Sequence, residues 1–325
     1  MLSKIFKLVP VIIFCLYQNT LYSKTTADLD FNPKYLSNYL SALLAHSNQN
    51  NNKAIKYFNN SRYLVDKHNK YLKNYVFSLV LNGEVKNAIK QIKSSKNKKN
   101  TKFFEAQILL LIDSLQKKKF KKSDLALIEL QNFQNYGTYQ FIIYETLNSY
   151  KNLFETKKID VNILKDLGKL SFINEAFQNC YLDNPKAKSN FINLINSNDG
   201  DYSRYLFFYL NYIIKKNDLK TPVKIAQTIN ELESNLLVNQ SKSWINSSNF
   251  KIFKKIFSCQ KEENILSEFF FLISNFLASE RKFDESNFYL NISIYLNPKF
   301  YFNLSHLVDN YYENENYEGI KDVLT

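Results

Sequence analysis

Apolar side chains recur at helical spacing along most of this chain, and the segment 267–298 shows the pattern most clearly. In its first half the bulky apolar residues fall on one helical face: Phe270, Ile273 and Leu277. A polar turn follows, and the second half carries another apolar face: Phe283, Leu290 and Ile294. Small residues stand where two packed helix backbones would have to approach closely: Ser274, Ser286 and Ser293. The segment therefore predicts an antiparallel helix pair that ends at Pro298.

A similar pattern near the start of the chain repeats at a fixed interval. The sequence Lys-Ala-Ile-Lys at 53–56 returns as Asn-Ala-Ile-Lys at 87–90, an interval of 34. Asn32 suits the cap of a helix and the proline after it suits the first turn, so we expect the first pair to begin here. The segment 34–36 is echoed at 70–72, an interval of 36, which leaves the register of the first helix in each pair open by two positions.

Prolines mark further helix starts in the middle of the chain. Every proline after residue 23 follows a residue that can cap a helix: Asn32-Pro33, Asn184-Pro185, Thr221-Pro222 and Asn297-Pro298. Helical periodicity continues through 103–237. Over 157–198 no echo at the interval of 34 is visible, so we expect the helices of a solenoid with degenerate repeats there. The Ser- and Asn-rich stretch 239–249 is expected to form an exposed loop. Its Trp244 is expected to pack against a flanking helix, with a binding role as the alternative.

The segments 35–102 and 267–325 resemble the tetratricopeptide repeat (TPR), a 34-residue antiparallel helix pair that stacks on copies of itself. The resemblance implies an all-α fold, a right-handed α-solenoid of antiparallel helix pairs over residues 32–325. It also implies that the first helices line a concave groove for a polypeptide partner. Carried onto the best-matched repeats, the groove-lining positions are Phe271, Asn275, Ala278, Asp309 and Tyr312. The alternative for each of them is an ordinary exposed helix face.

Residues 1–23 are expected to form a signal peptide. Lys4 and Lys7 precede an apolar run of ten residues, which is too short to span a bilayer comfortably. Residues 24–31 then form a short linker to the helical domain. We therefore expect an exported, periplasmic protein, and the alternative is a membrane anchor formed by the uncleaved segment. At the other end the last helix stops at Thr325 without a polar cap, which indicates a truncated chain or a partner that covers this end.

Charge and hydrophobic content narrow the class of protein. Hydrophobic residues make up 45% of the chain, which is enough for a core and too many for global disorder. The formal net charge is +13, and lysines cluster at 93–102 and 117–122. We expect these lysines in solvated loops between helices. Nucleic acid is disfavoured as a partner because no recognition motif and no interleaved aromatic residues accompany the lysines, whereas an anionic membrane surface is the alternative.

Three cysteines are present, and Cys15 would leave with the signal peptide. Cys180 and Cys259 lie far apart in the sequence, and distant repeats of a solenoid do not normally touch. We therefore expect two buried free thiols rather than a disulfide.

Catalytic signals are absent from the sequence. It contains none of the phosphate-binding, dinucleotide-binding, zinc-protease or serine-hydrolase motifs, and its three histidines have no ligand spacing. We therefore expect no enzymatic activity, no cofactor, no metal and no small-molecule substrate. The expected function is that of an exported scaffold that binds a protein or peptide partner, for example in cell-envelope assembly. The alternative is a membrane-tethered accessory factor whose basic loops face anionic lipid.

Overall fold

The computed structural model describes residues 32–68, 70–133, 137–160, 167–197 and 203–324. The predicted signal peptide, 1–23, and the predicted linker, 24–31, lie outside the described residues. Every regular element within the described residues is a helix, and no strand is present there. The all-α prediction is therefore confirmed.

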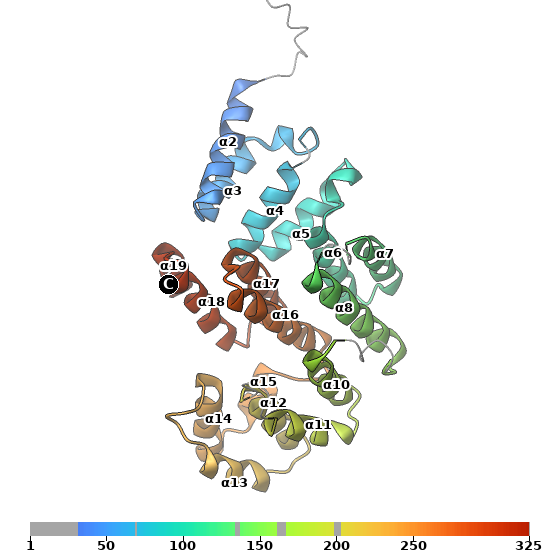
Figure 1. Ribbon diagram of the computed structural model, residues 1–325, viewed down its shortest axis with the longest axis vertical. Helices are drawn as coiled ribbons and strands as arrows, with labels where there is room; N and C mark the ends of the chain where they lie inside the picture. Colours follow the sequence, from blue (N-terminus) through green and yellow to red (C-terminus); the bar gives the residue numbers. More distant parts are fainter. Residues whose placement is uncertain (1–31, 69, 134–136, 161–166, 198–202, 325) are drawn as a thin grey trace, which may run out of the picture.

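Seventeen α-helices and two short 3-10 helices follow one another along the described residues (Figure 1). The first part contains α2 (Pro33–Ser47), α3 (Asn51–Asn60), η1 (Arg62–Leu64), α4 (Tyr71–Leu81), α5 (Val85–Ser94), η2 (Lys98–Thr101), α6 (Phe104–Gln116), α7 (Phe120–Gln131) and α8 (Thr138–Thr156). The middle part contains α10 (Lys169–Tyr181), α11 (Lys186–Ile195), α12 (Arg204–Lys215), α13 (Lys220–Thr228), α14 (Leu236–Asn246) and α15 (Lys251–Ile256). The last part contains α16 (Glu262–Ser279), α17 (Phe283–Leu296), α18 (Phe302–Glu313) and α19 (Tyr317–Leu324).

Most helices pack against their neighbours in sequence. The closest pairs are α2 with α3, α4 with α5, α6 with α7, α10 with α11, α16 with α17, and α18 with α19. Successive pairs also touch, for example α3 with α4 and α17 with α18. This arrangement is compatible with the predicted α-solenoid. The second helices of the outer pairs keep the expected interval of 34, because α3 begins at Asn51 and α5 at Val85, and α17 begins at Phe283 and α19 at Tyr317.

One turn geometry recurs between the two helices of each pair. The residue two places after the first helix has a positive φ in eight turns of the described chain: Gln49, Gly83, Lys118, Asp183, Asn217, Ser248, Arg281 and Glu315. In each turn the N–H of this residue bonds to the carbonyl three places back, and the next N–H bonds five places back. These two bonds define the Schellman motif, which satisfies the last carbonyls of a helix. Most successive turns are separated by an interval close to 34 residues.

Serine pairs hold the two helices of the α16–α17 hairpin together. Ser274 and Ser286 are fully buried, and their Oγ atoms lie 2.9 Å apart. At the other end of the contact, the Ser293 hydroxyl donates to the Ser267 carbonyl at 2.6 Å, and the Ser267 hydroxyl donates to the Ser293 carbonyl at 2.8 Å. The prediction that small residues mark the helix contact is confirmed. The hydroxyls also find hydrogen-bond partners across this contact, so their burial costs little.

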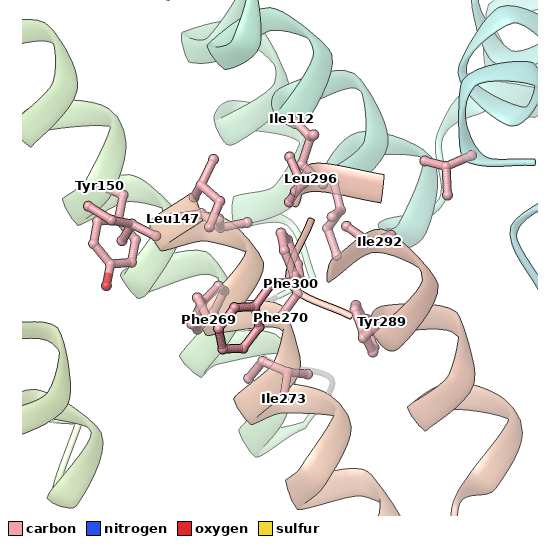
Figure 2. Packing of buried hydrophobic residues seen from close by; sticks show 14 of the residues in the cluster. Ile112, Leu147, Tyr150, Phe269, Phe270, Ile273, Tyr289, Ile292, Leu296 and Phe300 are labelled. Atoms are coloured by element: carbon pink, nitrogen blue, oxygen red, sulfur yellow. The ribbon is translucent and has the colours of Figure 1, made fainter. Parts of the chain in front are cut away.

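The α16–α17 hairpin lies at the centre of the molecule and contacts helices far away in sequence (Figure 1). Helix α17 packs on α4 and α5, where the rings of Phe288 and Phe77 are 4.7 Å apart between centroids. Helix α16 packs on α8, where Phe269 meets Tyr150 (Figure 2). Phe300, which follows α17, contacts Phe207 of α12 at 5.5 Å. In a simple solenoid each repeat contacts only its neighbours, and the chain advances in one direction. Here the chain instead returns, so that its last helices contact helices from its first half.

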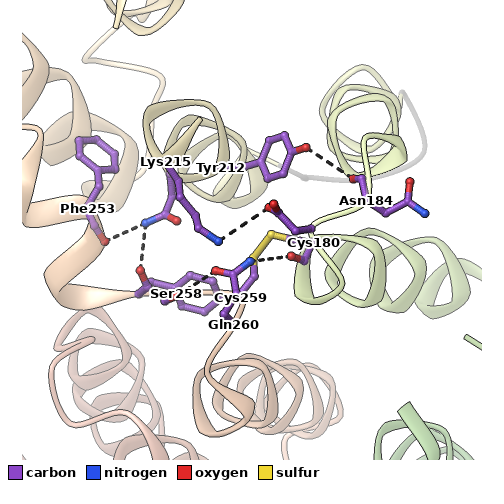
Figure 3. Close-up of a disulfide and its surroundings, with 11 residues drawn as sticks. Cys180, Asn184, Tyr212, Lys215, Phe253, Ser258, Cys259 and Gln260 are labelled. Carbon is purple, nitrogen blue, oxygen red and sulfur yellow. Dashed lines mark hydrogen bonds and ion pairs between the residues drawn. A yellow bond between two sulfur atoms is a disulfide. The ribbon is translucent and has the colours of Figure 1, made fainter. Parts of the chain in front are cut away.

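This return corrects the prediction about the cysteines. Cys180, at the end of α10, and Cys259, between α15 and α16, form a disulfide with a Cα–Cα distance of 5.7 Å (Figure 3). The Gln260 side chain donates to the Cys180 carbonyl at 2.8 Å beside it. The prediction of two free thiols was wrong because it assumed that distant repeats stay apart. After helices α11 to α15 the chain instead comes back to the end of α10, and this return brings Cys259 next to Cys180.

The stretch 239–249 is helical rather than the predicted loop, because most of it belongs to α14. The Asn235 side chain caps this helix by accepting a hydrogen bond from the Val238 N–H at 3.0 Å. Ser241 is fully buried and donates to the carbonyl one turn back, so a polar composition does not prevent helix formation here. Trp244 is 6% exposed and its ring lies against Phe253. The prediction that it packs against a flanking helix is confirmed.

Candidate functional site

A cleft lies where α12, α14, α16 and α18 converge. Its volume is about 240 Å³. Residues from all four helices line it, among them Arg204, Leu236, Phe271, Asn275 and Ser305. Phe271 and Asn275 are two of the five residues that the TPR resemblance assigns to the partner groove. The cleft therefore combines predicted partner-binding residues with side chains from distant parts of the chain.

Arg204, the first residue of α12, is held firmly at the wall of the cleft. Its Nε and Nη2 donate to the two carboxylate oxygens of Glu268, each at 2.8 Å, and Nη2 also donates to Asn303 Oδ1 at 2.9 Å. Its guanidinium carbon lies 3.7 Å from the ring centroid of Phe271, a cation–π contact. The Glu268 side chain is 2% exposed, so this ion pair is buried on its acidic side. Among the described residues Nη1 has no hydrogen-bond partner, which leaves two donors of a fixed guanidinium available.

His306 of α18 closes one side of this arrangement. Its ring centroid is 5.4 Å from that of Phe271, and its buried Nε2 has no hydrogen-bond partner within the described part of the chain. Burial lowers the pKa of His306 to about 4, and the nearby positive charge of Arg204 adds to the effect. The imidazole is therefore neutral at physiological pH. It therefore adds no charge beside the arginine, and it does not itself line the cleft.

The remaining lining gives the cleft an apolar wall and a polar rim. Leu236, at the start of α14, is 61% exposed and presents its apolar side chain to the cleft. Asn275 is exposed and makes no hydrogen bond among the described residues, so its amide can both donate and accept. Ser305 donates to the Phe302 carbonyl at 2.7 Å and keeps its acceptor sites. These groups can hold one apolar side chain of a bound segment and form hydrogen bonds with the backbone of that segment.

The other three predicted residues do not line the cleft. Ala278 is half-buried near the end of α16, beyond Asn275. Asp309 is exposed on α18, and partial burial followed by the Glu313 charge raises its pKa. Tyr312 is 63% exposed on the same helix. All three lie at exposed or half-exposed helix positions outside the cleft, so their assignment to a partner groove stays a prediction.

Arg204, Glu268 and His306 were missed by sequence reasoning. Arg204 and Glu268 are distant in sequence, and no repeat relates their helices. The one available signal was Glu268 itself, an acid within the apolar run of α16. A buried carboxylate requires a partner, but the sequence does not say which basic residue supplies it.

No family model, no curated protein and no solved structure matches this chain. No helix among the described residues is long and apolar enough to cross a membrane. Nor does the described part of the chain contain three or more His, Cys, Asp or Glu side chains grouped as metal ligands would be. The chemistry of the cleft's own side chains therefore decides what it can bind.

Proposed function

We propose that this protein is an exported scaffold that binds a polypeptide segment, and that the cleft between α12, α14, α16 and α18 holds part of it. The observation that carries the proposal is Arg204, a fixed guanidinium with unused donors beside an exposed apolar wall. An arginine of this kind loses little side-chain entropy on binding, and arginine and aromatic side chains dominate the affinity of many interfaces. The TPR resemblance supports the same class of function.

The charge of the cleft favours a backbone carbonyl over a free carboxylate. The Glu268 carboxylate neutralises Arg204, and His306 is uncharged. A neutral acceptor such as a peptide carbonyl therefore suits the Nη1 donors best. The size of the cleft, about 240 Å³, fits one large apolar side chain against Leu236. We propose an extended segment that places such a side chain in the cleft and its neighbouring carbonyl on Arg204.

Export is supported by the cysteine pair. Structural disulfides persist in oxidising compartments and are rare in the cytosol. Cys180 and Cys259 are bonded, and the segment 1–23 has the pattern of a signal peptide. The intact mass of the protein recovered from the envelope of a producing cell tests this part. A chain that begins at Lys24 is expected, whereas a retained Met1 would favour the membrane-tethered alternative.

Peptide selection tests the binding function. A random-peptide library displayed on phage is selected on the immobilised full chain, and the affinities of synthesised hits are measured by fluorescence anisotropy. We expect Leu236→Ser and Asn275→Ala each to weaken binding about tenfold, equivalent to about 1.4 kcal/mol, with an unchanged melting temperature. Leu232→Ser is the matched control, because Leu232 is 97% exposed, precedes α14 and lies outside the cleft.

Two results would contradict the proposal. A selection that yields no saturable binder would exclude a general polypeptide-binding role. Hits that bind all three variants as tightly as the unmutated chain would show that the cleft is not the site. An Asp309→Ala variant, tested in parallel, shows whether binding extends along α18.

A further inference from the structure

A larger hollow lies on the surface formed by α5, η2, α6 and α7, away from the cleft described above. Its volume is about 810 Å³. We name it the basic groove, because six lysines line it: Lys93, Lys98, Lys102, Lys117, Lys119 and Lys122. The sequence placed these lysines in solvated loops, but the structure places Lys122 within the first turn of α7 and gathers the six around one hollow.

Four apolar side chains also line the basic groove: Leu110 on α6 and Leu125, Ala126 and Ile128 on α7. Leu125 is 64% exposed and Ile128 is 60% exposed, so two large apolar side chains face solvent within the same hollow. Isolated exposed leucines are common on protein surfaces, whereas an apolar strip in a hollow that is also lined by charged side chains is typical of an interaction site.

The charge of the rim is not neutralised within the protein. The two acids of the groove are already paired: Asp113 with Lys93 and with Lys117, the latter at 2.6 Å, and Glu129 with Lys102 at 2.8 Å. Six lysines and two carboxylates leave a formal charge of +4. The side chains of Lys119 and Lys122 have no hydrogen-bond or ion-pair partner in the described part of the chain. The groove therefore complements an occupant that is both acidic and apolar.

The antiparallel course of α6 and α7 places the charges at both ends of the apolar strip. Lys98 and Lys102 precede α6, whereas Lys117 and Lys119 follow it in the turn to α7. Helix α6 has 13 residues, so these two ends are about 20 Å apart. An amphipathic helix of three to four turns has this length and carries its apolar residues as a continuous stripe.

We propose that the basic groove binds an acidic amphipathic helix of a partner protein, whose apolar stripe lies on Leu125 and Ile128 and whose carboxylates meet the lysines. Nucleic acid is the weaker candidate because, among the described residues, no aromatic side chain lines the groove for base stacking. A lipid bilayer is also weaker, since a flat surface fits a hollow of this volume less well than a helix does. This inference does not depend on the peptide cleft.

The test uses the full chain and a synthetic 14-residue peptide with leucines at helical i, i+3, i+4 and i+7 spacing and glutamates elsewhere. A scrambled peptide of the same composition and a peptide with every Glu replaced by Gln are the controls. We expect saturable binding of the first peptide that weakens as salt rises from 50 to 150 mM, and at least tenfold weaker binding of both controls.

Matched variants locate the binding. Lys119→Ser with Lys122→Ser removes two lining lysines, whereas Lys118→Ser with Lys121→Ser removes two neighbours that do not line the groove. The first pair, and separately Ile128→Ser, should weaken binding at least tenfold, and the second pair should leave it within twofold. Equal losses from both lysine pairs, or no saturable binding of the Glu peptide, would overturn the proposal. The groove would be assigned to membranes instead if the peptide fails to bind and the protein binds anionic lipid vesicles more tightly than neutral ones. That vesicle binding would also have to be lost in the same variants.

Discussion

Replacing Arg204 with Met leaves the Glu268 carboxylate buried without its counter-charge. The carboxylate is 2% exposed, and its described partners are the two 2.8 Å bonds from Arg204. Breaking a buried ion pair by removing one partner typically costs about 3–5 kcal/mol. Asn303 would also lose the bond to its fully buried Oδ1. Because Arg204 keeps some exposure, we expect a loss of about 4 kcal/mol in the free energy of unfolding.

A double-mutant cycle separates the charge from the packing. In Arg204→Met with Glu268→Met the buried charge is gone, and apolar replacements of buried ion pairs are often neutral or stabilising. The side-chain oxygen of Asn303 remains unpaired in this double variant, so we expect its free energy of unfolding to stay about 1–2 kcal/mol below that of the unmutated protein. Urea unfolding followed by circular dichroism measures all members of the cycle. Lys102→Met, which breaks an exposed pair with Glu129, is the control and should cost less than about 1 kcal/mol.

A cost of Arg204→Met no larger than that of the exposed control would show that Glu268 is not left as an uncompensated buried charge. A double variant as unstable as the single one would show that the loss comes from packing and not from an uncompensated charge.

Three further predictions concern the disulfide, a buried histidine and the turns. Reducing the Cys180–Cys259 bond should lower the free energy of unfolding by about 4 kcal/mol, because the bond closes a long loop in the unfolded chain; identical urea midpoints with and without reductant would contradict this. The pKa of His306 is near 6.5 in the unfolded chain and about 4 in the folded protein, so the unfolded chain binds a proton more readily between these values. The free energy of unfolding should therefore fall by up to about 3 kcal/mol as the pH is lowered from 6.5 toward 4. His306→Phe should flatten this slope, and an unchanged slope would assign it to another group. Arg281 and Gly83 both have a positive φ, which glycine adopts more readily than other residues. In urea titrations Arg281→Gly should therefore raise, and Gly83→Ala lower, the free energy of unfolding by about 0.5–1 kcal/mol. Changes of the same sign would show that backbone strain does not govern these turns.

Local features of the fold could be predicted from the sequence. The helix pair 267–298 and its serine contacts follow from apolar spacing and small residues, and both are present in α16 and α17. The start of α2 follows from Asn32 and Pro33, and the Asn32 side chain accepts a hydrogen bond from the Lys34 N–H at 2.9 Å. These features depend on residues within a few turns of one another, which periodicity and capping describe well.

Contacts between distant helices could not be predicted. The rings of Phe77 and Phe288 meet because α17 returns to α4, and no local pattern encodes that contact. The same return made the cysteine prediction wrong. For the candidate site, a repeat position was enough to select Phe271 and Asn275. Arg204 depends on the tertiary arrangement, so its place in the cleft required the structure.

The central position of the α16–α17 hairpin has a consequence for the order in which the chain folds. Helices α4, α5, α8 and α12 are synthesised before the hairpin and the segment after it, against which they pack. At about 5–20 residues per second, the segment between α5 and α16 takes roughly 10 to 30 s to make. During that interval Phe77 lacks its contact with Phe288, and Phe207, once made, still lacks its contact with Phe300, so the early helices cannot reach their final packing. The nascent chain therefore passes through a partly assembled state, and aggregation or chaperone binding competes with folding until residue 300 has emerged.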